Sequence, residues 1–181
     1  MTNRILLGAS ALSLAIVGVA CLTPRANADT TQSVTAQFSV TVPYAVGITV
    51  TQPTAITGLK ASSVGTTTSS ISTTNNTGKT GTVTVKDADT NTNLATSDGS
   101  YTIPTSSKVA AGTSSWGIST DSGSTYKAMP ASNGTAATVG NDGAATTGSY
   151  TVTYGVGVSS VQRAGTYSDT IQFTMTADTS N

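Results

Sequence analysis

The sequence predicts an all-β protein: an antiparallel, immunoglobulin-like β-sandwich of about seven to nine strands that follows an N-terminal signal peptide. Threonine makes up about a fifth of the 181 residues, and Gly, Ser and Asn are also abundant. Thr favours strands, whereas Gly, Ser and Asn favour the turns between them. Several segments alternate apolar and polar residues, as a strand with one buried face does. Long runs of helix-forming residues are absent from the sequence after residue 28.

The first 28 residues have the layout of a secretory signal peptide. Arg4 precedes an apolar run over Ile5–Leu22, and Ala26-Asn27-Ala28 is a small-x-small cleavage site. We expect cleavage after Ala28 and a mature, secreted or surface-exposed chain. A retained membrane anchor is the alternative, but the run is near the lower length limit for a membrane span.

Cys21 raises a second alternative, a lipid-modified cysteine at the end of the apolar run. Lipoproteins usually carry Leu three residues before that cysteine, and here the residue is Gly18. The site at Ala28 is the better match. Cleavage there leaves a mature chain without cysteine, which must be stable through core burial alone.

The expected strands define one domain over residues 29–181. In chain order they are Val34–Val42, Val46–Val50, 66–74, Thr82–Lys86, 101–103, 115–120, Tyr150–Val158 and Tyr167–Thr176. Val34–Val42 has the cleanest alternation of these strands. It can pair within its own sheet or with the sheet of a neighbouring copy. We favour its own sheet, because only the short Pro43-Tyr44 bend separates it from the next strand. Residues 131–148 hold few apolar residues and predict a flexible loop.

Four motifs occur in the order "ISTTNNTGKTGTVTV", "SSWGIST", "YKAMP" and "YTVTYGVGVSSVQRAGTYSDTIQFTMTAD". Together, over roughly residues 34–178, they resemble secreted β-sandwich surface proteins of Saccharibacteria-type candidate-phylum bacteria. The resemblance implies an exported, surface-associated protein and no particular activity. The ending "AGTYSDTIQFTMTA" also resembles the last strand of spore-coat-U-like pilins, whose cysteines the mature chain lacks.

The stretch "DADTNTNLATSDG" contains the candidate metal ligands. Measured against a twelve-residue calcium loop, the oxygen-bearing residues at positions one, three, five, seven and twelve are Asp87, Asp89, Asn91, Asn93 and Asp98. Thr92 stands where such a loop needs Gly, Asp98 is shorter than the usual Glu, and the preceding segment is a strand rather than a helix. The alternative is a polar turn whose Asp and Asn side chains cap their own backbone. Any calcium site here is expected to be weak; no other cofactor is expected.

Two aromatic residues have expected roles. Trp116, the only Trp, is expected in the core with its indole N–H bonded to one acceptor, and a sugar-stacking platform is the alternative. Tyr167 is expected to hold a corner of the fold through its hydroxyl.

Composition also limits the function. The mature chain has six Lys and Arg against eight Asp, a net charge of about −2, which predicts neither nucleic-acid nor membrane binding. It has no His, no Glu and no Cys, so the usual general bases, thiol nucleophiles and zinc ligands are missing. We therefore expect an exported structural or adhesive protein rather than an enzyme. The alternatives are a self-assembling pilus or fibre subunit, which makes homo-oligomers, and a carbohydrate-binding module; the expected partner is a cell-surface protein or glycan.

Overall fold

The computed structural model describes residues 35–143 and 146–179, and the expected signal peptide, with Cys21 and Ala28, lies outside them. The chain divides into two units between Val40 and Thr41. The described part of the first unit, residues 35–40, has no regular secondary structure and is exposed. In the second unit every regular element is a strand, and no described residue belongs to a helix that could cross a membrane.

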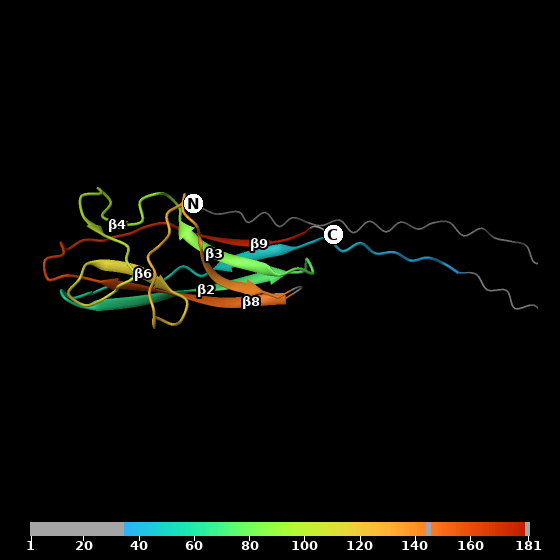
Figure 1. The fold of residues 1–181 in the computed structure, drawn as a ribbon, viewed down its shortest axis with the longest axis horizontal. Coiled ribbons are helices and arrows are strands. Elements are labelled where there is room, and N and C mark those ends of the chain that lie inside the picture. The colour runs from blue at the N-terminus through green and yellow to red at the C-terminus, as the bar shows by residue number, and fades with distance from the viewer. Residues whose placement is uncertain (1–34, 144–145, 180–181) are drawn as a thin grey trace, which may run out of the picture. The chain divides into compact units, whose positions relative to one another are not determined.

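The described residues form nine strands in three antiparallel sheets. The strands are β1 (Val46–Val50), β2 (Val64–Asn75), β3 (Gly81–Asp87), β4 (Leu94–Ala95), β5 (Thr102–Ile103), β6 (Ser115–Ser119), β7 (Ala137–Asp142), β8 (Thr146–Gly157) and β9 (Ile171–Ala177). One sheet has the order β1-β2-β8-β6, a second has the order β7-β3-β9, and β4 pairs with β5. Figure 1 shows the long strands β2 and β8 running side by side, with β3 beside β9.

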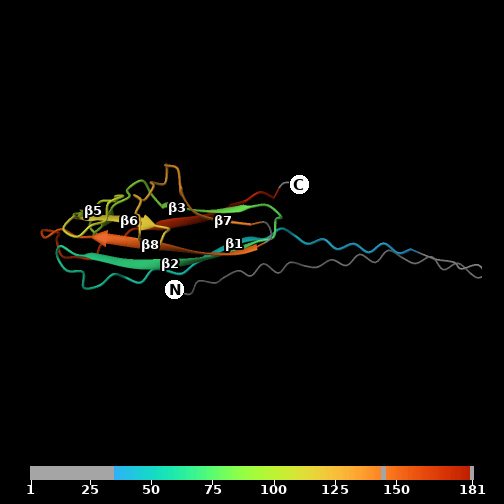
Figure 2. The ribbon, with the colours of Figure 1, turned by 60° about the horizontal axis from the view of Figure 1, so that its bottom comes forward.

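One hydrophobic core draws on both larger sheets. Ile71 and Val152 from the four-stranded sheet and Val83 and Val85 from the three-stranded sheet are all fully buried in it. In Figure 2, β3 and β7 lie on one side of this core and β2 and β8 on the other. The alternation of apolar and polar residues in β3, β8 and β9 therefore orients one face of each strand towards the core, whereas the buried residues of β2 are Ile71 and the polar Ser69, Thr73 and Asn75.

The outer face of β8 is also covered, which its sequence did not lead us to expect. Gly155 was expected to face outwards, and the ring of Tyr126, from the connection after β6, lies over it. A Cβ atom at Gly155 would lie 2.5 Å from Cε1 of Tyr126, so any larger residue would displace the ring. Neighbouring β6 is buried along its whole length, from Ser115 to Ser119.

The strand expected over Val34–Val42 does not form over residues 35–42, the part of this range that the structure describes. Residues 35–45 have no regular secondary structure, and Phe38, Val40 and Val42 are 79%, 59% and 73% exposed. The pairing of β1 with β2 explains the error. Val46 already lies opposite Asn75, the last residue of β2, so the residues before Val46 have no β2 residue left to pair with.

The loop expected over residues 131–148 is wrong for Ala137–Asp142 and from Thr146 onwards. Strand β7 occupies Ala137–Asp142 and pairs with β3, and β8 begins at Thr146. Val139, which packs against the core, is the apolar anchor that the composition seemed to lack. β3 offers an edge that a small-residue segment can pair with, and these backbone hydrogen bonds need no particular side chain.

Candidate functional site

The predicted calcium loop begins with three successive hydrogen bonds from backbone N–H groups to Asp and Asn side chains. The Oδ1 atom of Asp87 accepts from the backbone N–H of Asp89 at 2.9 Å, and Asp89 in the same way accepts from Asn91 at 2.6 Å. The side chain of Asn91 then accepts from the N–H of Asn93 at 3.3 Å. Each oxygen bonds the backbone two residues further on, as Asp and Asn do in polar turns. This is the alternative arrangement that the sequence left open.

Asp98, the last of the predicted ligands, belongs to a different turn. It lies between β4 and β5 and accepts from Oγ1 of Thr96 at 2.6 Å and from Oγ of Ser100 at 2.7 Å. These bonds, with that from Thr96 first, lower the pKa of Asp98 to about 2. The five predicted ligands therefore do not surround one point. Among the described residues, no group of three or more His, Cys, Asp or Glu side chains is placed to hold a metal ion.

A residue that the sequence analysis did not select, Asp169, meets Asp87 instead. Asp87 is completely buried at the end of β3, and Asp169 lies just before β9, which pairs with β3. The Oδ2 atoms of both are buried, and neither has a hydrogen-bond partner among the described residues. Burial, together with the neighbouring Asp87 carboxylate, raises the pKa of Asp169 to about 7.

Trp116 links the polar turn to the core. It is 1% exposed in β6, and its indole Nε1–H donates to the backbone carbonyl of Thr92 at 2.9 Å. The predicted core position and single acceptor are confirmed. Trp116 also lines the pocket described below, but so little of its ring is exposed that little area is left on which a sugar could stack.

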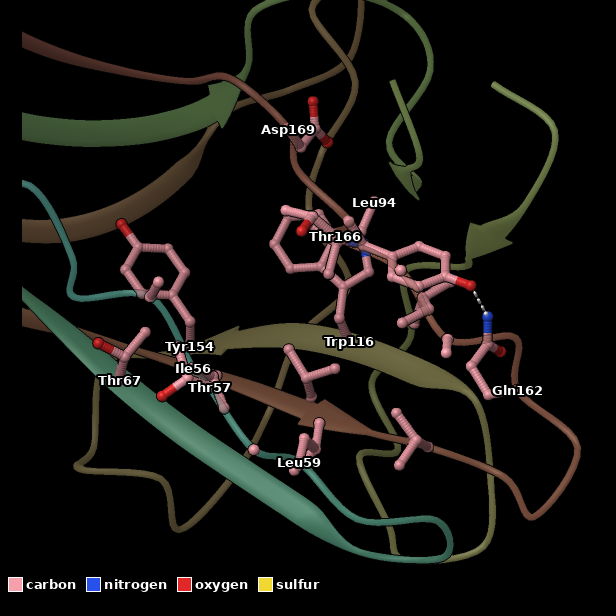
Figure 3. A pocket seen from close by; sticks show the side chains of 18 of the residues that line it. Ile56, Thr57, Leu59, Thr67, Leu94, Trp116, Tyr154, Gln162, Thr166 and Asp169 are labelled. Carbon is pink, nitrogen blue, oxygen red and sulfur yellow. Dashed lines mark hydrogen bonds between the residues drawn. The ribbon is translucent and has the colours of Figure 1, made fainter. Parts of the chain in front are cut away.

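A pocket of about 760 Å³ lies against the inner face of β2 and β8. Figure 3 shows Thr67 and Tyr154 beside Ile56 and Leu59, which come from the connection between β1 and β2. This connection approaches the sheet closely at Gly65, where an added Cβ atom would lie 2.6 Å from Cγ2 of Ile56. The pocket is largely apolar, because its floor is the continuation of the core face.

The opposite wall of the pocket is the segment between β8 and β9, which Tyr167 holds. The Tyr167 hydroxyl donates to the carbonyl of Arg163 at 2.8 Å and accepts from Nε2 of Gln162 at 2.7 Å, the bond drawn in Figure 3. The corner-holding role predicted for the Tyr167 hydroxyl is confirmed. The guanidinium of Arg163 also lies 5.1 Å from the ring centre of Tyr101.

Sequence reasoning missed Asp169 and the pocket because neither has a local pattern. Asp169 stands alone in "TYSDTI", far along the chain from Asp87, and only the pairing of β9 with β3 brings them together. The pocket is lined by segments that lie far apart in the sequence, from residues 53–67 through Leu94, Ile103 and Trp116 to residues 154–171.

Comparison with known proteins supplies no relative from which a function could be transferred. No protein-family model matches the chain, and no curated protein matches it. The resemblance to secreted surface proteins and pilins therefore stays a prediction.

Proposed function

We propose that this chain is an exported, non-catalytic subunit of a surface structure. In this proposal its two larger sheets form an immunoglobulin-like sandwich, and residues 34–42 of one copy add a strand to the next copy. One observation carries the proposal: residues 35–42, which alternate as a strand does, expose their apolar side chains and pair with no strand among the described residues. Exposed apolar residues with this spacing are typical of a strand that pairs elsewhere.

The donor segment differs from an ordinary polar tail. Phe38, Val40 and Val42 alternate with Ser39 and Thr41, so in an extended conformation the three apolar side chains share one face. All three are more than half exposed. Burying them against a sheet would remove a large apolar area from water, at about 25 cal/mol for each Å².

Strand β2 provides an edge to receive the donor. β1 pairs with β2 only from Ile71 to Asn75, and the backbone N–H of Thr51 then bonds the carbonyl of Ser70 at 2.9 Å. Beyond that point, Val64–Ser69 has β8 on one side and, among the described strands, no partner on the other. The pocket begins next to this edge at Thr67, so a strand added there would place alternate side chains over apolar surface.

The alternative of a carbohydrate-binding module has less support. It rested on Trp116, which is buried, and on a flexible loop over residues 131–148, in which Ala137–Asp142 and the residues from Thr146 onwards are strand. An adhesive role remains compatible with assembly, because a fibre can present the Thr-rich outer faces of its subunits.

The proposal is tested with protein that begins at Asp29, compared with protein lacking residues 29–42. We expect the longer protein to form oligomers or fibres, measured by light scattering and electron microscopy, and the shorter protein to stay monomeric. In the longer protein, the double variant Phe38→Ser, Val40→Thr should also prevent assembly. The matched control Ser39→Ala, Thr41→Ala changes the opposite face of the same segment and should assemble normally.

The receiving edge is tested by cross-linking, because the chain after residue 28 has no cysteine of its own. Mixing Thr41→Cys protein with Thr66→Cys protein and oxidising should give a covalent heterodimer. Ser124→Cys, on the connection after β6, replaces Thr66→Cys as the control and should give none. Fibres formed by protein lacking residues 29–42 would show that the segment is not the donor, and equal cross-linking at Ser124→Cys would show that Val64–Ser69 is not the receiving edge.

A further inference from the structure

At the corner where Asp87 meets Asp169, the buried carboxylates lack a compensating positive charge. Asp87 is completely buried, and one of its carboxylate oxygens has no hydrogen-bond donor in the described chain. A buried charge without a partner is costly, and two adjacent carboxylates cannot both ionise unless a positive charge joins them.

The positively charged side chain next to this corner in the sequence does not supply that charge. Nζ of Lys86 donates to the backbone carbonyl of Ser132 at 2.9 Å. Asp89 adds a further negative charge that acts on Asp169. The corner therefore carries a negative field that only a proton or a cation from solution can neutralise.

We propose that Asp87 and Asp169 bind a hard divalent cation of the calcium type through their unpartnered Oδ2 atoms. Both ligands are carboxylate oxygens, which Ca²⁺ prefers, and the chain contains no His for a softer metal. Two carboxylates are fewer than a tight calcium site uses, so water completes the shell and the binding is weak, on the order of millimolar. This set is different from the loop that the sequence predicted, since Asn91, Asn93 and Asp98 have no part in it.

The position of the corner gives the cation a structural effect. The backbone N–H of Ala88 donates to the carbonyl of Thr170 at 2.9 Å, so the end of β3 already lies against the start of β9. Asp169 also lines the pocket, on the segment that Tyr167 holds. A cation between Asp87 and Asp169 would fasten this wall of the pocket to β3.

Terbium is a suitable probe, because it replaces calcium and emits when a nearby Trp is excited. Trp116 is the only Trp, and its indole bonds Thr92 in the turn that follows Asp87. At pH 8, where protons compete little for the pair, we expect sensitised terbium emission that calcium displaces. We also expect saturating calcium to raise the melting temperature of EDTA-treated protein by about 3 °C, as mass action requires of a ligand that binds the folded state.

Asp169→Asn is the decisive variant. Its amide can donate a hydrogen bond to the unpartnered carboxylate oxygen of Asp87, so the variant should fold, while it should lose both terbium emission and the calcium-dependent rise. Asp98→Asn removes a carboxylate of the predicted loop that lies outside the corner, and it should keep both. The proposal is overturned if the unmodified protein shows neither signal, if Asp169→Asn keeps them, or if Asp98→Asn abolishes them.

Discussion

The two halves of the four-stranded sheet bury their inner faces in different ways. In one half, Ser69–Thr73 of β2 and the paired Gly148–Val152 of β8 face the three-stranded sheet, and we call this the two-sheet end. In the other half, Val64–Thr68 and the paired Thr153–Gly157 face the irregular connections that surround the pocket, and we call this the pocket end. The same two strands run through both ends, so the difference arises from what covers them.

The contrast shows what a second sheet adds. At the two-sheet end, alternating side chains from both layers interdigitate, and Ile71, Val83 and Val152 are completely buried. At the pocket end, an irregular connection places only Ile56 and Leu59 against the sheet and leaves an apolar cavity. We therefore expect the two-sheet end to contribute most of the stability of the fold and the pocket end to provide any binding site.

Matched truncations of two isoleucines test this division most strongly. Ile71→Ala removes a completely buried side chain at the two-sheet end and should lower the free energy of unfolding by about 3 kcal/mol, because it leaves a cavity. Ile56→Ala removes the same atoms from the half-buried wall of the pocket and should cost less than about 1 kcal/mol. Urea denaturation of both variants gives the comparison, and equal losses would contradict it.

Substitutions of two glycines by alanine should show the same contrast in stability between the two ends, with a smaller effect. A Cβ atom at Gly140 in β7 would lie 2.1 Å from Cε1 of Tyr150, so Gly140→Ala should lower the free energy of unfolding by about 1–3 kcal/mol through overpacking. At Gly165, by the pocket, the nearest atom would be Cγ2 of Thr96 at 3.4 Å. Gly165→Ala should be neutral or should stabilise by up to about 1 kcal/mol, because alanine restricts the unfolded chain. Thermal unfolding checks both, and a neutral Gly140→Ala would show that the two-sheet end is more loosely packed than described.

The smallest effect concerns the β4–β5 turn. The folded-state pKa of Asp98, about 2, lies below its ordinary value of 3.8. Stabilisation by its hydrogen bonds is therefore complete above about pH 4 and is lost as the pH falls towards 2. We expect Asp98→Asn to melt with a weaker dependence on pH than the unmodified protein between pH 4 and 2. Because Asp98 is exposed the difference should be slight, and identical pH profiles would show that its bonds do not persist in solution.

The strands with a clear period of two were the simplest to predict. The segments around β1, β3, β8 and β9 alternate apolar and polar residues, and the structure forms strands in all four. The expected segments 66–74, 101–103 and 115–120, which lack this alternation, also overlap strands β2, β5 and β6. The environment of Trp116 was predictable for a related reason, since a large buried ring with one N–H needs one acceptor.

The errors came from two segments whose pairing depends on other strands. The segment 34–42 alternates perfectly but finds no partner because β2 ends opposite Val46. β7 has little apolar content but forms because the edge of β3 is available. Alternation indicates that a segment is able to pair, whereas the neighbouring strands determine whether it does.

The sequence by itself determined the strand-rich class and the face that each alternating strand buries, and it limited the segment after β3 to two interpretations, a calcium loop or a polar turn. These follow from local periodicity and from side chains that bond their own backbone. Only the tertiary structure decided that Asp87 meets Asp169 rather than Asp98, and that the core face of β2 and β8 continues into a pocket. Both depend on contacts between segments far apart in the chain, which are set by how the strands pair and by where the three-stranded sheet ends.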